Sequence, residues 1–129
     1  MLKPLTPDDI RSPFARYSHG VEVPAGCRLV FCSGQLGIDH ATAQLVEGIE
    51  GQAERALVNL EAVLAAAGMT TADVVKTTIF LSDLGNFATV NAIYAKHFPA
   101  PAPARSTVQV AALPLKALIE LEVVARKSE

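Results

Sequence analysis

The sequence predicts a single α+β domain in which two helices cover one face of a mostly antiparallel sheet. Two stretches repeat apolar residues at steps of three and four, which is typical of amphipathic helices. Five stretches are rich in apolar and β-branched residues, which is typical of strands. Their order is ββ-α-β-α-ββ, and helices that lie against a mostly antiparallel sheet define an α+β fold. The 129 residues fit one domain, covering residues 1–129.

The N-terminal part of the chain contains the first two predicted strands. Residues 1–13 contain three prolines and mixed charges, so we expect an irregular arm. A short strand is predicted at 17–23 and ends at the turn 24–26. The apolar stretch 28–36 predicts a buried strand, and residues 38–48 form a loop.

The first predicted helix covers residues 49–67, and Gly68 follows it as a left-handed C-terminal cap. The β-branched stretch 74–83 predicts a second buried strand. Asn86 can then cap a second helix at 87–98. This helix has an apolar stripe, formed by Phe87, Val90, Ile93, Tyr94 and Phe98.

Three prolines between residues 99 and 103 forbid further helix. The last two strands are therefore predicted at about 105–112 and about 118–126. One face of the sheet is left without a helix and carries many apolar residues. We expect this face to pack against other copies of the chain.

Composition supports that expectation and limits the other classes of partner. Half of the residues are hydrophobic, which indicates either a homo-oligomer or an alanine-rich core. The sequence contains no run of about 18 uncharged apolar residues, so no membrane span is predicted. The formal net charge of −2 and the scattered basic residues make nucleic acid an unlikely partner. The N-terminus lacks an apolar signal core, and Cys27 and Cys32 are expected as reduced thiols, so the predicted location is cytoplasmic.

The last two strands carry the residues with the clearest chemistry. Strand alternation places Arg105 and Thr107 on one face of their strand, while Glu120 and Glu122 share one face of the other. In one interpretation, these polar side chains form a solvent-exposed face of the sheet, or Arg105 and Glu120 form an ion pair at its edge. In the other, Arg105 binds an anion in a cleft and Glu120 carries a proton.

Other chemistries find little support in the sequence. The three histidines have no ligand spacing with each other or with the cysteines, so no metal site is predicted. Ser33 lacks the preceding glycine that a nucleophile elbow needs. No glycine-rich phosphate loop is present.

Three segments together resemble the RidA (YjgF/Rid) family: "CSGQL", "AAAGMTTADVVKTTIFLSDLGNFATVNAIY" and "PARSTVQVAALP…IELEVVA". The resemblance runs from about residue 17 to residue 126. It implies a chorismate-mutase-like fold and a homotrimeric barrel with ligand clefts between subunits. It also implies hydrolysis of reactive enamines and imines, such as 2-aminoacrylate and 2-aminocrotonate, to 2-oxo acids and ammonia without a metal or organic cofactor.

The resemblance also implies roles for particular residues. Arg105 of "PARS" corresponds to the arginine that binds the substrate carboxylate. Glu120 corresponds to the glutamate that holds and activates the attacking water. Ser33 and Gly34 of "SGQ" correspond to residues that line the pocket.

Four further positions complete the implied substrate site. Tyr17 corresponds to a pocket tyrosine, and Asn91 to an asparagine near the subunit interface. Phe87 and Thr107 are expected to shape the pocket, and Thr107 replaces a frequent family cysteine. The usual "GPY" is "ARY" here, which places Arg16 near the pocket mouth.

Two further functions remain open at this point. A non-catalytic protein could use the same clefts to bind small carboxylates. Some members of the family are described as ribonucleases or translation inhibitors, and the acidic balance of this chain counts against that role.

Overall fold

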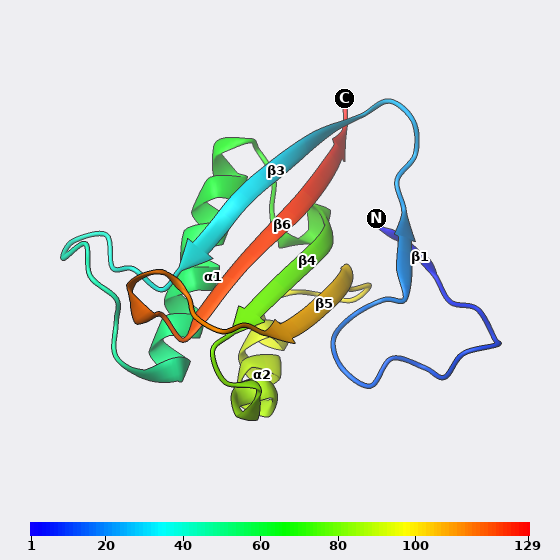
Figure 1. Ribbon diagram of the computed structural model, residues 1–129. Coiled ribbons are helices and arrows are strands. Elements are labelled where there is room, and N and C mark those ends of the chain that lie inside the picture. The colour runs from blue at the N-terminus through cyan, green and yellow to red at the C-terminus, as the bar shows by residue number, and fades with distance from the viewer.

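The computed structural model describes residues 1–129 and contains a four-stranded sheet with strand order β3-β6-β4-β5 (Figure 1). The strands are β3 (Cys27–Leu36), β6 (Ile119–Ser128), β4 (Val74–Leu81) and β5 (Ala104–Gln109). The pairs β3/β6 and β6/β4 are antiparallel, and β4/β5 is parallel. The mostly antiparallel sheet that the sequence predicts is therefore confirmed.

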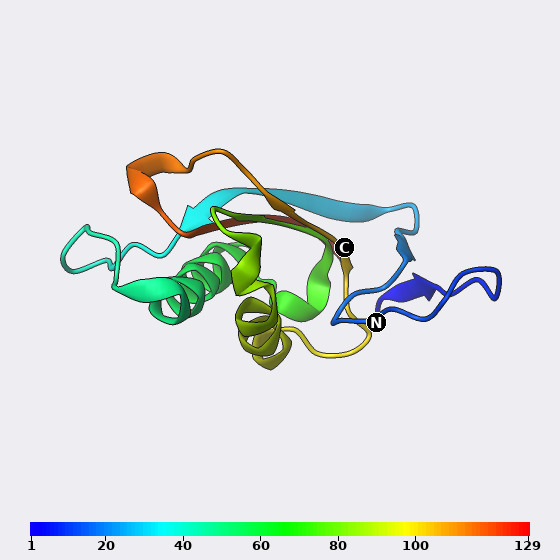
Figure 2. The same cartoon turned by 60° about the horizontal axis from the view of Figure 1, so that its bottom comes forward.

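Both helices, α1 (Gly48–Ala66) and α2 (Phe87–His97), lie on the same face of this sheet (Figure 2). Alternate residues of β4 and β6 point toward them and are fully buried. Together with the inner stripes of the helices, these residues form the main core: Leu57, Leu60, Leu64, Ile79, Leu81, Tyr94, Ile119 and Leu121. Burial of this apolar face is the main force that holds the helices to the sheet.

The N-terminal arm is more ordered than the sequence predicts. Two short strands, β1 (Lys3–Leu5) and β2 (Gly20–Glu22), pair antiparallel in a separate sheet. A 3.1 Å ion pair joins Lys3 to Glu22. The expected irregular arm is thus wrong for β1. Within the predicted strand at 17–23, β2 pairs with β1, and Ser18 forms an isolated parallel bridge to Ala104 of the main sheet. Pro4 obscured β1 because proline is usually a strand breaker, but it is tolerated in an edge strand.

Helix α2 begins at Phe87, as predicted, but its predicted side-chain cap is wrong. The side chain of Asn86 makes no capping hydrogen bond. Instead, Asp83 accepts a 2.8 Å hydrogen bond from the backbone N–H of Gly85, at the start of a 3₁₀ turn formed by Leu84–Asn86. This turn leads directly into α2, so Asn86 lacks the extended backbone that a capping residue normally has.

Polar contacts join the two helices at the end of α2. The ring of His97 contacts Glu54 at 2.9 Å and Glu61 at 3.2 Å, and both carboxylates belong to α1. Lys96 contacts Glu54 at 3.0 Å. The hydrogen bond from His97, followed by that from Lys96, lowers the pKa of Glu54.

A lowered pKa in the folded state means that ionised Glu54 stabilises the fold. This contribution is present above the ordinary carboxyl pKa and is lost as pH falls through the lowered value. We expect Glu54→Gln to reduce the free energy of unfolding by less than about 1 kcal/mol at neutral pH, because Glu54 is partly exposed. Urea unfolding of Glu54→Gln and of the control Glu50→Gln would measure this. Equal losses in the two variants, or a Glu54→Gln deficit that persists in acid, would contradict it.

The face of the sheet opposite the helices carries exposed apolar side chains. No helix covers it (Figure 2). Phe31 is 75% exposed and Leu29 is 50% exposed, both on β3, and Val108 of β5 is 42% exposed. Such a face is typical of a surface that contacts another subunit.

Candidate functional site

Arg105 lies at the beginning of β5 and points to the helix side of the sheet. Its Nε donates a 3.0 Å hydrogen bond to Oγ1 of Thr107, and its Nη2 donates to Oδ1 of Asn91 on α2. The guanidinium carbon lies 4.9 Å from the ring centre of Tyr94 and 5.7 Å from that of Phe87. The predicted shared direction of Arg105 and Thr107 is confirmed.

The third nitrogen of this guanidinium has no partner. Nη1 of Arg105 is buried and makes no hydrogen bond. Burial lowers the pKa of Arg105, although a guanidinium remains protonated at any physiological pH. No carboxylate forms an ion pair with it; the chain's ion pairs all involve other residues. A buried unpaired donor costs about 1–3 kcal/mol, so Arg105 is held in an unfavourable state that an anion would relieve.

Aromatic rings form a wall between the N-terminal segment and α2. The ring of Phe14 lies 5.6 Å from that of Tyr17 and 6.5 Å from that of Phe87. Tyr17 and Phe87 were predicted for the site, whereas Phe14 and Tyr94 were missed. The available signal for Tyr94 was its position three residues after Asn91, which places both on one face of α2.

Glu120 points to the opposite face of the sheet. Phe80 of β4 pairs with both Glu120 and Val108, so these three side chains share the open face. Arg105 and Thr107 alternate with Val108 along β5 and therefore point to the helix side. The predicted edge ion pair between Arg105 and Glu120 is wrong, because the two residues lie on different faces.

The carboxylate of Glu120 lies over the backbone of β3. A bulge between Cys32 and Gln35 contains Ser33 and Gly34. A Cβ atom added to Gly34 would lie 1.9 Å from Oε2 of Glu120, so the glycine leaves the room that this carboxylate occupies. Ser33 is exposed on the same segment.

The predicted site residues thus form two groups within one chain. The helix-side group contains Arg105, Thr107, Asn91, Phe87 and Tyr17. The open-face group contains Glu120, Ser33 and Gly34. One chain does not bring the two groups together. The helix-side group presents a guanidinium with an unpaired donor, and the open-face group presents a carboxylate.

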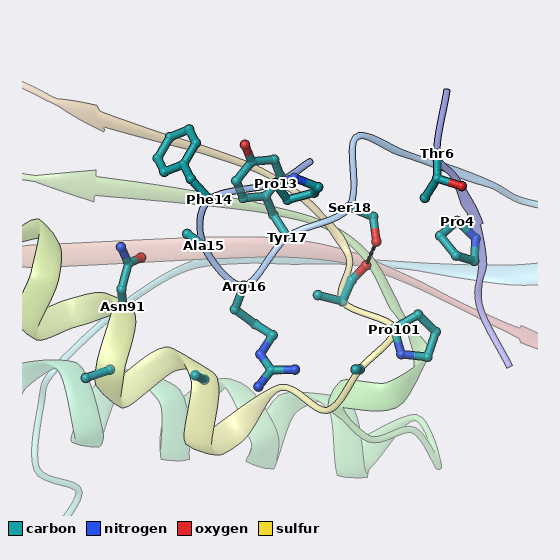
Figure 3. Close-up of a pocket in the computed structure, with 14 residues that line it drawn as sticks. Pro4, Thr6, Pro13, Phe14, Ala15, Arg16, Tyr17, Ser18, Asn91 and Pro101 are labelled. Atoms are coloured by element: carbon teal, nitrogen blue, oxygen red, sulfur yellow. Dashed lines mark hydrogen bonds between the residues drawn. The ribbon is translucent and has the colours of Figure 1, made fainter. Parts of the chain in front are cut away.

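A cavity of about 770 Å³ lies beside the helix-side group, between residues 13–18 and α2 (Figure 3). Tyr17 and Asn91 line it. Arg105 itself does not, although its hydrogen bond to Asn91 connects it to the wall.

The family model described as Endoribonuclease L-PSP matches residues 9–127, nearly the whole chain. The chain belongs to this family, the RidA (YjgF/Rid) family. The predicted resemblance is therefore confirmed. The RidA-type α+β fold is confirmed as well, because the crystal structure of RidA from the Antarctic bacterium Psychrobacter sp. has a TM-score of 0.76 at 38% identity, covering 97% of this chain and 99% of that one.

Two curated relatives match this RidA-family chain over almost their full lengths. The 2-iminobutanoate/2-iminopropanoate deaminase of Salmonella typhimurium is 39% identical over 128 residues, covering 97% of this chain and 98% of the relative. Protein DfrA of Myxococcus xanthus is 45% identical over 124 residues, covering 95% of this chain and 94% of the relative.

No helix of this RidA-family chain is both long enough and apolar enough to cross a membrane.

Proposed function

We propose that this chain hydrolyses 2-enamino and 2-imino acids, such as 2-aminoacrylate and 2-aminocrotonate, to 2-oxo acids and ammonia. The observation that carries the proposal is the half-buried Arg105, whose Nη1 has no partner and no nearby carboxylate. Substrates of this class carry a carboxylate that fits such a group. The deaminase name of the Salmonella relative supports the same reaction.

In this mechanism the enamine first tautomerises to its imine. Arg105 then binds the substrate carboxylate through charge-assisted hydrogen bonds from Nη1 and Nη2, which fixes the orientation of the C=N group. Thr107 and Asn91 hold the guanidinium in place from two sides. The rings of Tyr94 and Phe87 keep water away from it.

Glu120 acts as the base in the second half of the reaction. It takes a proton from water while the water oxygen bonds to the imine carbon. It gives this proton to the nitrogen, which completes the carbinolamine. It then carries the hydroxyl proton of the carbinolamine to the same nitrogen while the C–N bond breaks, the C=O bond forms and ammonia leaves. Backbone N–H groups near Thr107 stabilise the charge that develops. The overall reaction converts the imine and water into the 2-oxo acid and ammonia.

The proposed use of both Arg105 and Glu120 in one active site calls for a second copy of the chain. Since they point to opposite faces of one sheet, an active site that uses both takes each from a different subunit. We propose the homotrimer that the family resemblance implies, with the open face and its exposed Phe31 buried between subunits. Light scattering should then give a mass of three times 13.6 kDa.

A coupled assay tests the activity. A serine dehydratase generates 2-aminoacrylate, and the appearance of pyruvate is followed with and without the chain. We expect the chain to accelerate pyruvate formation, while an equal amount of albumin does not. Equal rates in the two samples would overturn the proposed reaction.

Thr107 is expected to act as a positioning residue for Arg105. Thr107→Val keeps the shape of the side chain but removes the oxygen that accepts from Nε. We expect kcat/KM to fall about tenfold, mainly through a higher KM, because a net hydrogen bond to a charged group contributes about 1.5–3 kcal/mol. Thr107→Ser retains the hydroxyl and should behave like the parent. Equal kinetics for the valine and serine variants would show that this hydrogen bond has no such role.

Two outcomes would redirect the proposal. Binding of a 2-oxo acid that depends on Arg105, without turnover of any imine, would favour a small-carboxylate-binding protein. The family description names an endoribonuclease. RNA binding that weakens steeply with salt would favour that role, although the net charge of −2 argues against it.

A further inference from the structure

The cavity between residues 13–18 and α2 is distinct from the proposed catalytic groups. Its walls include Tyr17 and Asn91 but none of Arg105, Thr107 or Glu120. Its volume of about 770 Å³ lies within the range of about 300–1,000 Å³ that is usual for small-molecule sites. The proposed reaction of three- and four-carbon imino acids at Arg105 and Glu120 gives this space no role.

The walls of this cavity are mostly apolar. Seven of the fourteen lining residues are hydrophobic, five of them alanines, and three prolines add further apolar surface. Ser18 also lines it, but its hydroxyl already donates a 2.5 Å hydrogen bond to the carbonyl of Ala102. Such walls favour a ligand with a hydrocarbon body.

Arg16 is the one charged residue among the fourteen. Figure 3 shows its side chain extending from the N-terminal segment toward α2, away from the rings of Phe14 and Tyr17. No aspartate or glutamate lines the cavity, and none of the six ion pairs of the chain includes Arg16. A guanidinium among apolar walls, without a counter-ion, matches a planar anion such as a carboxylate.

We propose that this cavity is a second small-molecule site, which binds organic monocarboxylates with an apolar chain. The carboxylate pairs with Arg16, and the hydrocarbon packs on the small side chains of Ala92 and Ala95 along α2. Asn91 lines the same cavity and accepts a hydrogen bond from Arg105. A bound ligand therefore touches a residue that holds the catalytic guanidinium.

Calorimetric titration with octanoate, butanoate and neutral octanamide tests the site. Octanoate should bind at least about tenfold more tightly than butanoate, because its longer chain buries more apolar surface. Arg16→Gln should weaken octanoate binding at least about tenfold and leave octanamide unchanged, because only the charge-assisted pair is lost. Arg16→Lys keeps the positive charge but loses the planar guanidinium. Its affinity for octanoate should therefore lie between those of the parent and Arg16→Gln.

Arg105→Gln serves as the matched control for the other guanidinium. Octanoate should keep its parental Kd for the Arg16 cavity in this variant, while any binding at Arg105 is lost, and the labelled methyl signals of Ala92 and Ala95 should shift during the titration. The proposal fails if octanoate does not bind, if Arg16→Gln binds it as tightly as the parent, or if Arg105→Gln abolishes binding. These outcomes are independent of imine hydrolysis, which the pyruvate assay measures separately.

Discussion

Replacement of Arg105 by alanine is expected to lower kcat/KM for 2-aminoacrylate by about 100-fold to 10,000-fold, because two hydrogen bonds to a charged group are lost. The loss should appear in both kcat and KM, since the carboxylate contact binds the substrate and also aligns its C=N carbon. Steady-state pyruvate formation with a dehydratase in excess measures both parameters.

Arg105→Lys separates charge from geometry. Lysine keeps a positive charge but cannot reproduce the contacts that the planar group makes with Thr107 and Asn91. We expect its activity to lie between those of the parent and Arg105→Ala. Thermal unfolding of each variant shows whether the fold persists. A folded Arg105→Ala protein with parental activity would remove Arg105 from the mechanism.

Replacement of Glu120 by glutamine should have a different kinetic signature. Glutamine has a similar shape but cannot take a proton from water, so kcat should fall by about 100-fold to 10,000-fold. KM should change little, because Glu120 is not the carboxylate anchor.

Glu122→Gln is the matched control for this experiment. Glu122 lies two residues along β6 on the same face and is exposed. It should tolerate the change with parental kinetics. A similar loss in both variants would indicate a general effect of charge on the open face, and full activity in Glu120→Gln would exclude Glu120 as the base.

The periodicity of the sequence was sufficient to predict the main fold. The helices and the four strands of the main sheet lie within a few residues of their predicted positions, because each has a long apolar pattern that burial enforces. β1 was missed because three residues carry almost no pattern and one of them is Pro4. The capping side chain before α2 was misassigned because Asp83 and Asn86 are both good capping residues, and only the backbone of the turn distinguishes them.

The site was predictable only in part, because local sequence patterns do not contain the contacts between distant segments. Alternation along one strand correctly placed Arg105 beside Thr107. Whether Arg105 and Glu120 share a face depends on the register of β5 and β6 against β4, which no local pattern contains. Their roles came from the family resemblance. Arg16 stood out in the sequence as a departure from the family, but its cavity arises from the packing of distant segments.

Mixing two inactive variants tests most directly whether Arg105 of one subunit works with Glu120 of another. Arg105→Ala and Glu120→Gln proteins are unfolded, combined in equal amounts and refolded together, and mixed oligomers are confirmed by native mass spectrometry. About a quarter of the sites in randomly mixed cyclic trimers should then contain both intact residues, so about a quarter of parental activity should return. Mixed oligomers that remain inactive would contradict an active site shared between subunits.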